Sequence, residues 1–199
     1  DFSPVSLLAV SPLLLVINPS VRAANIRELI ALAKSRPKGL NVGIASAGSA
    51  GHLAAELFKQ RTGTTDGIAS VMYKGGGAVQ VALIAGEVQL AFSTVTTALP
   101  QIASGKVKVL ASVAPSRLAA FPDVPTLGES NVQIDAVTPW QSILGPARLP
   151  RPIVARLNRE ITTLLKRPEI IERLRAAGSE PVGGTPEVLG RSEEHTSEL

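Results

Sequence analysis

Hydrophobic residues occur along this chain in two alternating patterns. Short, mostly apolar runs predict buried β-strands. The longer segments between them carry apolar residues at helical spacing and predict α-helices. The expected strands are residues 40–45, 68–72, 88–92 and 107–113, and the expected helices are residues 51–61, 78–85, 97–104 and 151–166. Such an alternation is typical of α/β architecture with mostly parallel strand pairing.

The first helix is marked by signals at both of its ends. Asn25 followed by Glu28 resembles a capping box, in which the two side chains satisfy free backbone N–H groups of the first turn. Ile26 and Leu29 begin the helical spacing, and Pro37 marks its end. We therefore expect a helix that starts near residue 26 and stops before residue 37.

The order of the segments predicts two lobes. Residues 20–132 are expected to form one complete α/β lobe, while residues 1–19 and 133–190 contribute a hinge strand and part of a second lobe. Because residue 1 is Asp and the chain starts in strand-like sequence, we expect a protein truncated at both ends. Residues 191–199, RSEEHTSEL, break the composition abruptly, so we interpret them as a non-native, adapter-like tail and exclude them.

Composition narrows the possible functions. The chain has 199 residues, a formal net charge of +4, no cysteine and two histidines. Disulfides and thiolate chemistry are therefore excluded, and no metal site is expected. The basic residues form no runs with interleaved aromatics, so we expect no nucleic-acid partner. The apolar stretch Leu13–Ile17 is far shorter than the roughly 20 residues that cross a bilayer, so no membrane insertion is expected.

The sequence IASAGSAGHLAAELF passes from an expected strand through a loop of glycine and serine into an expected helix. In this loop, which is Ser46, Ala47, Gly48 and Ser49, backbone N–H groups and the helix dipole favour an anion such as a carboxylate or phosphate. The alternative is a helix cap at Ser49 with a tight turn, and the residues alone do not separate the two. His52, in the first helical turn, is either bonded to backbone or in contact with a ligand.

Two further strand ends carry polar or glycine-rich residues. Tyr73 precedes a glycine run that includes Gly75 and Gly76, which offers a phenol and a second set of backbone donors. Ser93 and Thr94 follow the next expected strand, where an α/β sheet presents its ligand groups, although both also suit the cap of the next helix. Three such strand ends in succession favour a binding crevice.

Signatures of nucleotide binding and of catalysis are incomplete. Gly43 and Gly48 have the spacing of a phosphate-binding loop, but serine and alanine stand where the lysine and the hydroxyl residue are required, so no cofactor is expected. The sequence AGSAG resembles a nucleophile elbow around Ser49, whereas His52 lies on the same helical turn and is badly placed as a base. We therefore expect no catalytic residue and no enzyme; a serine hydrolase that uses Ser49 is the alternative from another class.

Taken together, the motifs resemble one family. The blocks DFSPVSLLA, GIASAGSAGHLAAELF, YKGGGAVQVALIAGEVQLAF, ALPQIASGKVKVLA and FPDVPTLGE occur in order at suitable spacing, and they resemble the Bug-type solute-binding receptors of tripartite tricarboxylate transporters. The resemblance implies a type II periplasmic-binding-protein (Venus-flytrap) fold and a precursor with a signal peptide. It also implies a periplasmic receptor, monomeric at full length, that captures a small carboxylate and hands it to a membrane permease. A ligand sensor of the same fold with a signalling partner is the alternative.

The resemblance also implies where the ligand binds. Family members hold a carboxylate through loop backbone groups and ordered waters, which agrees with a ligand site at residues 46–49, residues 73–77 and Ser93. Trp140 matches a family position near the cleft, with packing between the lobes as the alternative. Many relatives carry Asp where this chain has Ser93, so the resemblance implies a preference for plain or hydroxy carboxylates over amine-bearing ligands.

Overall fold

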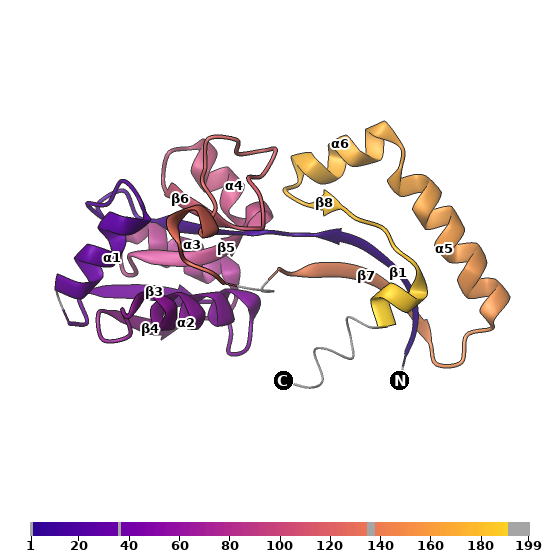
Figure 1. Ribbon diagram of the computed structural model, residues 1–199, viewed down its shortest axis with the longest axis horizontal. Helices are drawn as coiled ribbons and strands as arrows, with labels where there is room; N and C mark the ends of the chain where they lie inside the picture. Colours follow the sequence, from indigo (N-terminus) through magenta and orange to yellow (C-terminus); the bar gives the residue numbers. More distant parts are fainter. Residues whose placement is uncertain (1, 36, 135–137, 191–199) are drawn as a thin grey trace. The chain divides into compact units, whose positions relative to one another are not determined.

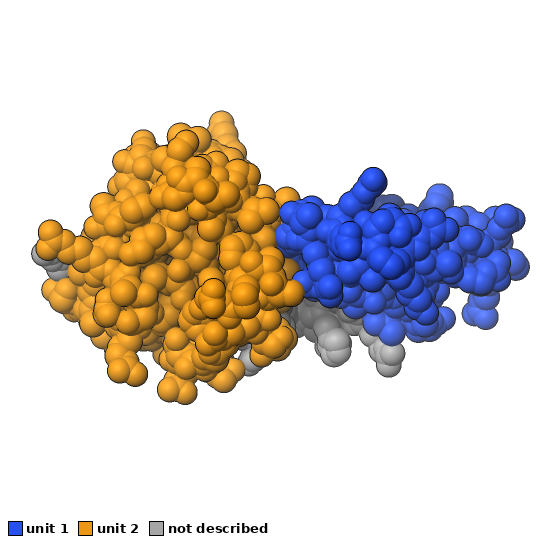
Figure 2. All heavy atoms as spheres, turned by 90° about the horizontal axis from the view of Figure 1, so that it is seen from above, with its two compact units in different colours: residues 1–11, 140–199 blue, residues 12–139 orange. Residues whose placement is uncertain are grey.

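The computed structural model describes residues 2–35, 37–134 and 138–190. The chain divides into two compact units, one of residues 12–139 and one that combines residues 1–11 with 140–199 (Figure 2). The first boundary thus falls before the strand that begins at Leu13, whereas the sequence prediction placed it after residue 19. The interpretation of residues 191–199 as a foreign tail lies outside the described residues.

The larger unit is built on a five-stranded mixed sheet (Figure 1). Its strands are β2 (Leu13–Ile17), β3 (Leu40–Ile44), β4 (Ile68–Met72), β5 (Leu90–Thr94) and β6 (Lys108–Val113), in the spatial order β4-β3-β5-β2-β6. β3 pairs in parallel with β4 and β5, but β2 pairs antiparallel with β5 and β6. The mostly parallel pairing expected from the sequence therefore fails at β2, which runs opposite to both of its neighbours.

Four helices cover the two faces of this sheet. α1 (Ile26–Ser35) and α2 (Ala50–Thr62) pack on one face, and α3 (Gly76–Ala85) and α4 (Val95–Ala103) pack on the other. β3, β4 and β5 are parallel, and each is followed by one helix. The amino ends of α2, α3 and α4 therefore all lie at the edge of the sheet where these strands end. A short 3-10 helix, η1 (Gly128–Ser130), lies in the connection after β6.

The predicted capping box at the start of α1 is confirmed. Asn25 Oδ1 accepts the backbone N–H of Glu28 at 2.9 Å, and the Glu28 carboxylate accepts the backbone N–H of Ala24 at 2.8 Å. The first bond satisfies a donor that a helix start leaves without an intrahelical partner, and the second holds the residue before the cap against the first turn. The cap therefore fixes the point at which the chain enters α1.

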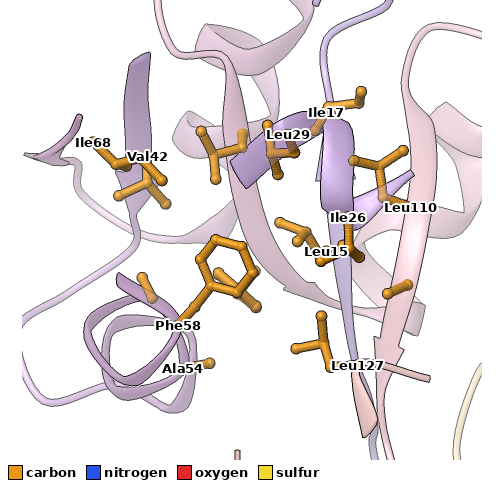
Figure 3. Close-up of a cluster of buried hydrophobic side chains, with 14 of the residues drawn as sticks. Leu15, Ile17, Ile26, Leu29, Val42, Ala54, Phe58, Ile68, Leu110 and Leu127 are labelled. Carbon is orange, nitrogen blue, oxygen red and sulfur yellow. The ribbon is translucent and has the colours of Figure 1, made fainter. Parts of the chain in front are cut away.

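Two hydrophobic clusters lie on the two faces of the sheet. Along β2 the side chains alternate, so that Leu13, Leu15 and Ile17 join one cluster while Leu14 and Val16 join the other. The larger cluster also contains residues of α1 and α2 (Figure 3). Because β2 contributes to both clusters, its apolar run is continuous rather than alternating with polar residues, as is typical of a central strand.

Within its described residues, the second unit contains a three-stranded antiparallel sheet, two longer helices, and a helical segment at residues 186–190. Its strands are β1 (Phe2–Val10), β7 (Trp140–Pro146) and β8 (Glu180–Pro181), in the order β7-β1-β8. α5 (Arg151–Leu165) is tied to β1 by Asn158, whose Nδ2 donates to the carbonyl of Val5 at 2.9 Å. Neither α5 nor α6 (Pro168–Ala176) contains a fully buried residue. In the described part of this unit, α5 and α6 therefore bury fewer of their side chains than the helices of the larger unit do.

Replacement of Phe58 by alanine is expected to destabilise the larger unit strongly. Phe58 is fully buried on α2 (Figure 3), and its ring centroid lies 5.8 Å from that of Phe92. Loss of the ring leaves a cavity, so we expect Phe58→Ala to lower the free energy of unfolding by about 3–5 kcal/mol in urea denaturation. Leu53→Ala on the same helix removes a half-exposed side chain and serves as the control. Equal effects of the two variants would contradict this assignment of the core.

Candidate functional site

A pocket of about 260 Å³ lies in the larger unit where the parallel strands end and three helices begin. β3 and β5 contribute their carboxyl ends, and α2, α3 and α4 contribute their amino ends. The lining residues are Leu13, Gly43, Ala45, Ser49, Ala50, Gly51, Gly76, Val79, Phe92, Ser93, Thr94, Thr97 and Pro139. This is the edge at which open α/β sheets bind their ligands.

The amino end of α2 forms one wall of the pocket. Ser49 is the N-cap residue, and its hydroxyl accepts the backbone N–H of His52 at 3.2 Å while it donates to the carbonyl of Ser46 at 2.9 Å. Gly48 has a φ of +73°, which a residue with a side chain adopts only under strain. The N–H groups of Ala50 and Gly51 precede the first hydrogen bond of α2, so they have no partner within the helix.

The amino ends of α3 and α4 also line the pocket. Gly75 caps α3 with a φ of +94°, and its N–H donates to the carbonyl of Ala45 at 2.9 Å, which holds the glycine turn against the end of β3. Thr94 caps α4, where its hydroxyl accepts the N–H of Thr97 at 3.3 Å and shares a 2.8 Å bond with the Thr97 hydroxyl. One of these two hydroxyl hydrogens is therefore left to donate elsewhere.

Ser93 lies at the back of the pocket and is 8% exposed. Its Oγ accepts the side-chain N–H of Gln80 at 2.8 Å. The sequence prediction included Ser93 but missed Gln80, which lies on α3 and is 4% exposed. The available signal was a single amide side chain within the apolar stretch AVQVALIA.

No charged side chain lines this pocket among the residues that the structure describes. Its positive character comes instead from the amino ends of three helices, each equivalent to roughly half a positive charge. Backbone N–H groups and hydroxyl groups supply the donors. Such an arrangement is chemically suited to hold an anion without covalent chemistry.

Ser49, Gly76 and Ser93 are the predicted site residues that line the pocket. The other loop residues, Ser46, Ala47 and Gly48, lie outside its lining, as does Gly75. Thr94, named beside Ser93 in the sequence, also lines the pocket, so each of the three strand ends contributes at least one expected residue.

His52, Tyr73 and Trp140 are also outside the lining of the pocket. His52 Nδ1 accepts the backbone N–H of Gly48 at 3.1 Å, so the imidazole is bonded to the loop. The Tyr73 hydroxyl donates to Glu87 at 3.4 Å, and partial burial together with the Glu87 carboxylate raises the pKa of Tyr73. Trp140 begins β7 in the other unit, opposite Val10, and its side chain is 39% exposed.

A polar cluster lies on the side of α2 that faces β4. Lys59, although buried, places its Nζ 2.7 Å from Glu56 Oε1 and 3.0 Å from Ser70 Oγ, and Ser70 donates to the same carboxylate at 2.8 Å. Burial by itself raises the pKa of Glu56, but hydrogen bonds from Lys59 and Ser70 outweigh it, so the pKa is lowered from its usual value. The cluster therefore stabilises the ionised form of Glu56.

With the geometry described, the chain can be compared with known proteins. Residues 1–191 match the tripartite tricarboxylate transporter family receptor, and the chain belongs to this family. It is 34% identical over 187 residues to protein BugT of Bordetella pertussis, covering 94% of this chain and 57% of BugT. It is 32% identical over 190 residues to a UPF0065 protein from the tcbD-tcbE intergenic region of Pseudomonas sp. strain P51, covering 95% of this chain and 56% of that protein.

Solved structures give the same result. The chain superposes on R. palustris Rpa4515 with adipate at a TM-score of 0.90 and 32% identity, covering 98% of this chain and 64% of Rpa4515. It superposes on MatC (Rpa3494) from Rhodopseudomonas palustris with bound malate at a TM-score of 0.76 and 29% identity, covering 90% of this chain and 60% of MatC. The periplasmic binding protein BugD also matches, at a TM-score of 0.84 and 27% identity, over 98% of this chain and 65% of BugD. The expected Venus-flytrap fold class and the resemblance to Bug-type receptors are thus confirmed.

The chain spans little more than half the length of these two curated relatives, BugT and the UPF0065 protein. Within its described residues, no helix combines the length and the apolar character needed to cross a membrane. The family is a class of solute-binding receptors rather than of enzymes.

Replacement of Gly51 by alanine is expected to disturb the wall of the pocket. A Cβ at this position would lie 2.6 Å from the backbone oxygen of Phe92, so α2 must move away from β5. We expect Gly51→Ala to lower the free energy of unfolding by about 1–3 kcal/mol in urea denaturation. Gly77→Ala, at the start of α3, meets no atom within 4 Å and is the control. A neutral Gly51→Ala would show that the close approach does not matter.

The polar cluster predicts a pH dependence of stability. Because the pKa of Glu56 is lower in the folded protein than its usual value of 4.5, ionised Glu56 contributes stability above pH 4.5, and this contribution is lost as the pH falls through the folded pKa. We expect Glu56→Gln to destabilise the protein more at pH 7 than at pH 3, measured as free energy of unfolding. The exposed Glu172→Gln is the control. A loss from Glu56→Gln that persists undiminished at pH 3 would contradict the prediction.

Proposed function

We propose that this chain is the ligand-binding part of a periplasmic receptor for a small dicarboxylate. The pocket at the amino ends of α2, α3 and α4 takes one carboxylate of the ligand. The observation that carries the proposal is the convergence of these three helix starts on one pocket, together with Ser93. Helix dipoles and unpaired N–H groups favour a negative ligand, and no acidic side chain among the described lining residues opposes it.

The ligands of similar proteins support this class of solute. Rpa4515 was solved with adipate and MatC with malate, and both ligands are small dicarboxylates. Ser93 extends the comparison to the choice of solute, because a neutral hydroxyl offers no negative charge to a ligand amine. We therefore propose a plain or hydroxy dicarboxylate rather than an amino acid as the ligand.

In the proposed mechanism, binding is non-covalent and is coupled to closure of two lobes. Residues 12–139 form the lobe with the described pocket, and residues 1–11 and 140–190 contribute to the other lobe. A ligand that contacts both lobes stabilises their closed arrangement, which a membrane permease of a tripartite transporter then recognises. Trp140 and the loop 46–48 are proposed to approach the ligand in that closed arrangement.

A catalytic role for Ser49 is not part of this proposal. The Ser49 hydroxyl donates to the Ser46 carbonyl and accepts a backbone N–H, and the imidazole of His52 accepts the N–H of Gly48 through Nδ1. A nucleophilic serine needs its hydrogen directed at a general base. These contacts support a capping role for Ser49 instead.

The proposal predicts that dicarboxylates stabilise the chain against thermal unfolding. It also predicts that a negative charge introduced into the pocket prevents this stabilisation. We expect adipate or malate to raise the melting temperature, with a stabilisation of about 2.7 kcal/mol at one hundred times the dissociation constant. Thr97→Asp places a carboxylate among the lining residues and should abolish the rise, since like charges repel.

The matched control is Thr65→Asp, the same substitution at an exposed position that does not line the pocket. It should leave the rise in melting temperature unchanged. A rise with L-arginine but not with either diacid, or a rise that survives Thr97→Asp, would refute the proposed carboxylate site.

A further inference from the structure

A buried polar pair, Gln80 and Ser93, stands out within the apolar layer between α3 and the sheet. Gln80 is 4% exposed and Ser93 is 8% exposed, and Gln80 Nε2 donates to Ser93 Oγ at 2.8 Å. The residues on either side of Gln80 along α3 are apolar. Burial of an amide and a hydroxyl costs free energy that an apolar pair of the same size avoids. Packing alone therefore does not account for the pair.

The hydrogen bond from Gln80 determines whether the Ser93 hydroxyl directs its hydrogen or a lone pair toward the pocket. A hydroxyl carries one hydrogen and two lone pairs. Because the Gln80 N–H occupies one lone pair, the hydroxyl hydrogen is left to point toward the pocket that Ser93 lines. We propose that Gln80 is a positioning residue that sets Ser93 as a hydrogen-bond donor to an anionic group of the ligand. The inference rests on the proposed function and deepens it.

The reverse orientation of this bond is less favourable. If Ser93 donated to Gln80 Oε1, the amide nitrogen would be left without a partner in the interior. In the observed arrangement, Oε1 is the amide atom without a partner among the described residues. A buried acceptor without a partner is tolerated more readily than a buried N–H. A carboxylate in the pocket strengthens the observed direction further, because donors in series polarise one another.

The arrangement also accounts for selectivity between ligand groups. An ammonium group requires an acceptor, and the hydrogen that Ser93 directs at the pocket opposes it. Gln80 does not line the pocket, so its influence on the ligand passes through Ser93. Loss of Gln80 should consequently matter only while the Ser93 hydroxyl is present.

A double-mutant cycle tests this dependence. The chain, Gln80→Leu, Ser93→Ala and the double variant are titrated calorimetrically with adipate and with malate. For whichever acid binds, each single substitution should weaken binding about tenfold, as expected for a hydrogen bond to a charged group. The double variant should bind no more weakly than Ser93→Ala. A merely structural role for Gln80 predicts additive losses instead, which would overturn the inference.

Gln80→Met is a second test that keeps the side-chain length. Its thioether has no N–H to donate, so the Ser93 hydroxyl loses the bond that fixes its direction, and binding should weaken as much as in Gln80→Leu. Circular dichroism establishes that the variants are folded. Unchanged affinity in folded Gln80→Met would overturn the inference and leave the proposed function standing. A wild-type chain that binds neither acid would overturn the proposed function, and the inference with it.

Discussion

The close approach of helices to the sheet at glycine positions is the constraint on which the candidate site depends. A Cβ at Gly51 would meet the backbone oxygen of Phe92 at 2.6 Å, and a Cβ at Gly43 would meet the side chain of Val79 at 2.8 Å. The first glycine lets the amino end of α2 lie against β5, and the second lets α3 lie against β3. Larger residues would push both helices outward and separate the backbone donors that face the pocket. The site is thus produced by backbone packing before any polar side chain contributes.

Much of the fold could be predicted because buried positions recur in the sequence as a periodic pattern of hydrophobic residues. β4 and the start of α5 match the predicted segments, and Asn25 with Glu28 marked the start of α1 correctly. The strand predicted at residues 88–92 is instead Leu90–Thr94, because the N–H groups of Glu87 and Val88 donate to the carbonyl of Ala82 and close the end of α3. Val88 is fully buried all the same. The hydrophobic pattern predicts which residues are buried, but it does not predict which backbone groups form hydrogen bonds with one another.

For the candidate site, the positions of the residues could be predicted from the sequence, but the directions of their side chains could not. Strand ends in an α/β sheet are identifiable from sequence, which is why Ser49, Gly76 and Ser93 were singled out and all line the pocket. The direction of a side chain from such an end depends on tertiary partners that sequence does not show. Tyr73 turns to Glu87, a residue beyond the far end of α3, and Gln80 reaches Ser93 across the packed layer. Neither pairing follows from spacing along the chain.

A pocket without charged side chains has a physical consequence for a receptor that must also release its ligand. A lysine or arginine buried against a carboxylate forms a strong, geometrically demanding pair, and its own desolvation is costly when the ligand leaves. Helix amino ends and hydroxyl donors carry no full charge, so the empty pocket is not penalised in the same way. In the proposed function, binding then depends on several moderate contacts made together, of which the Ser93 hydroxyl is one.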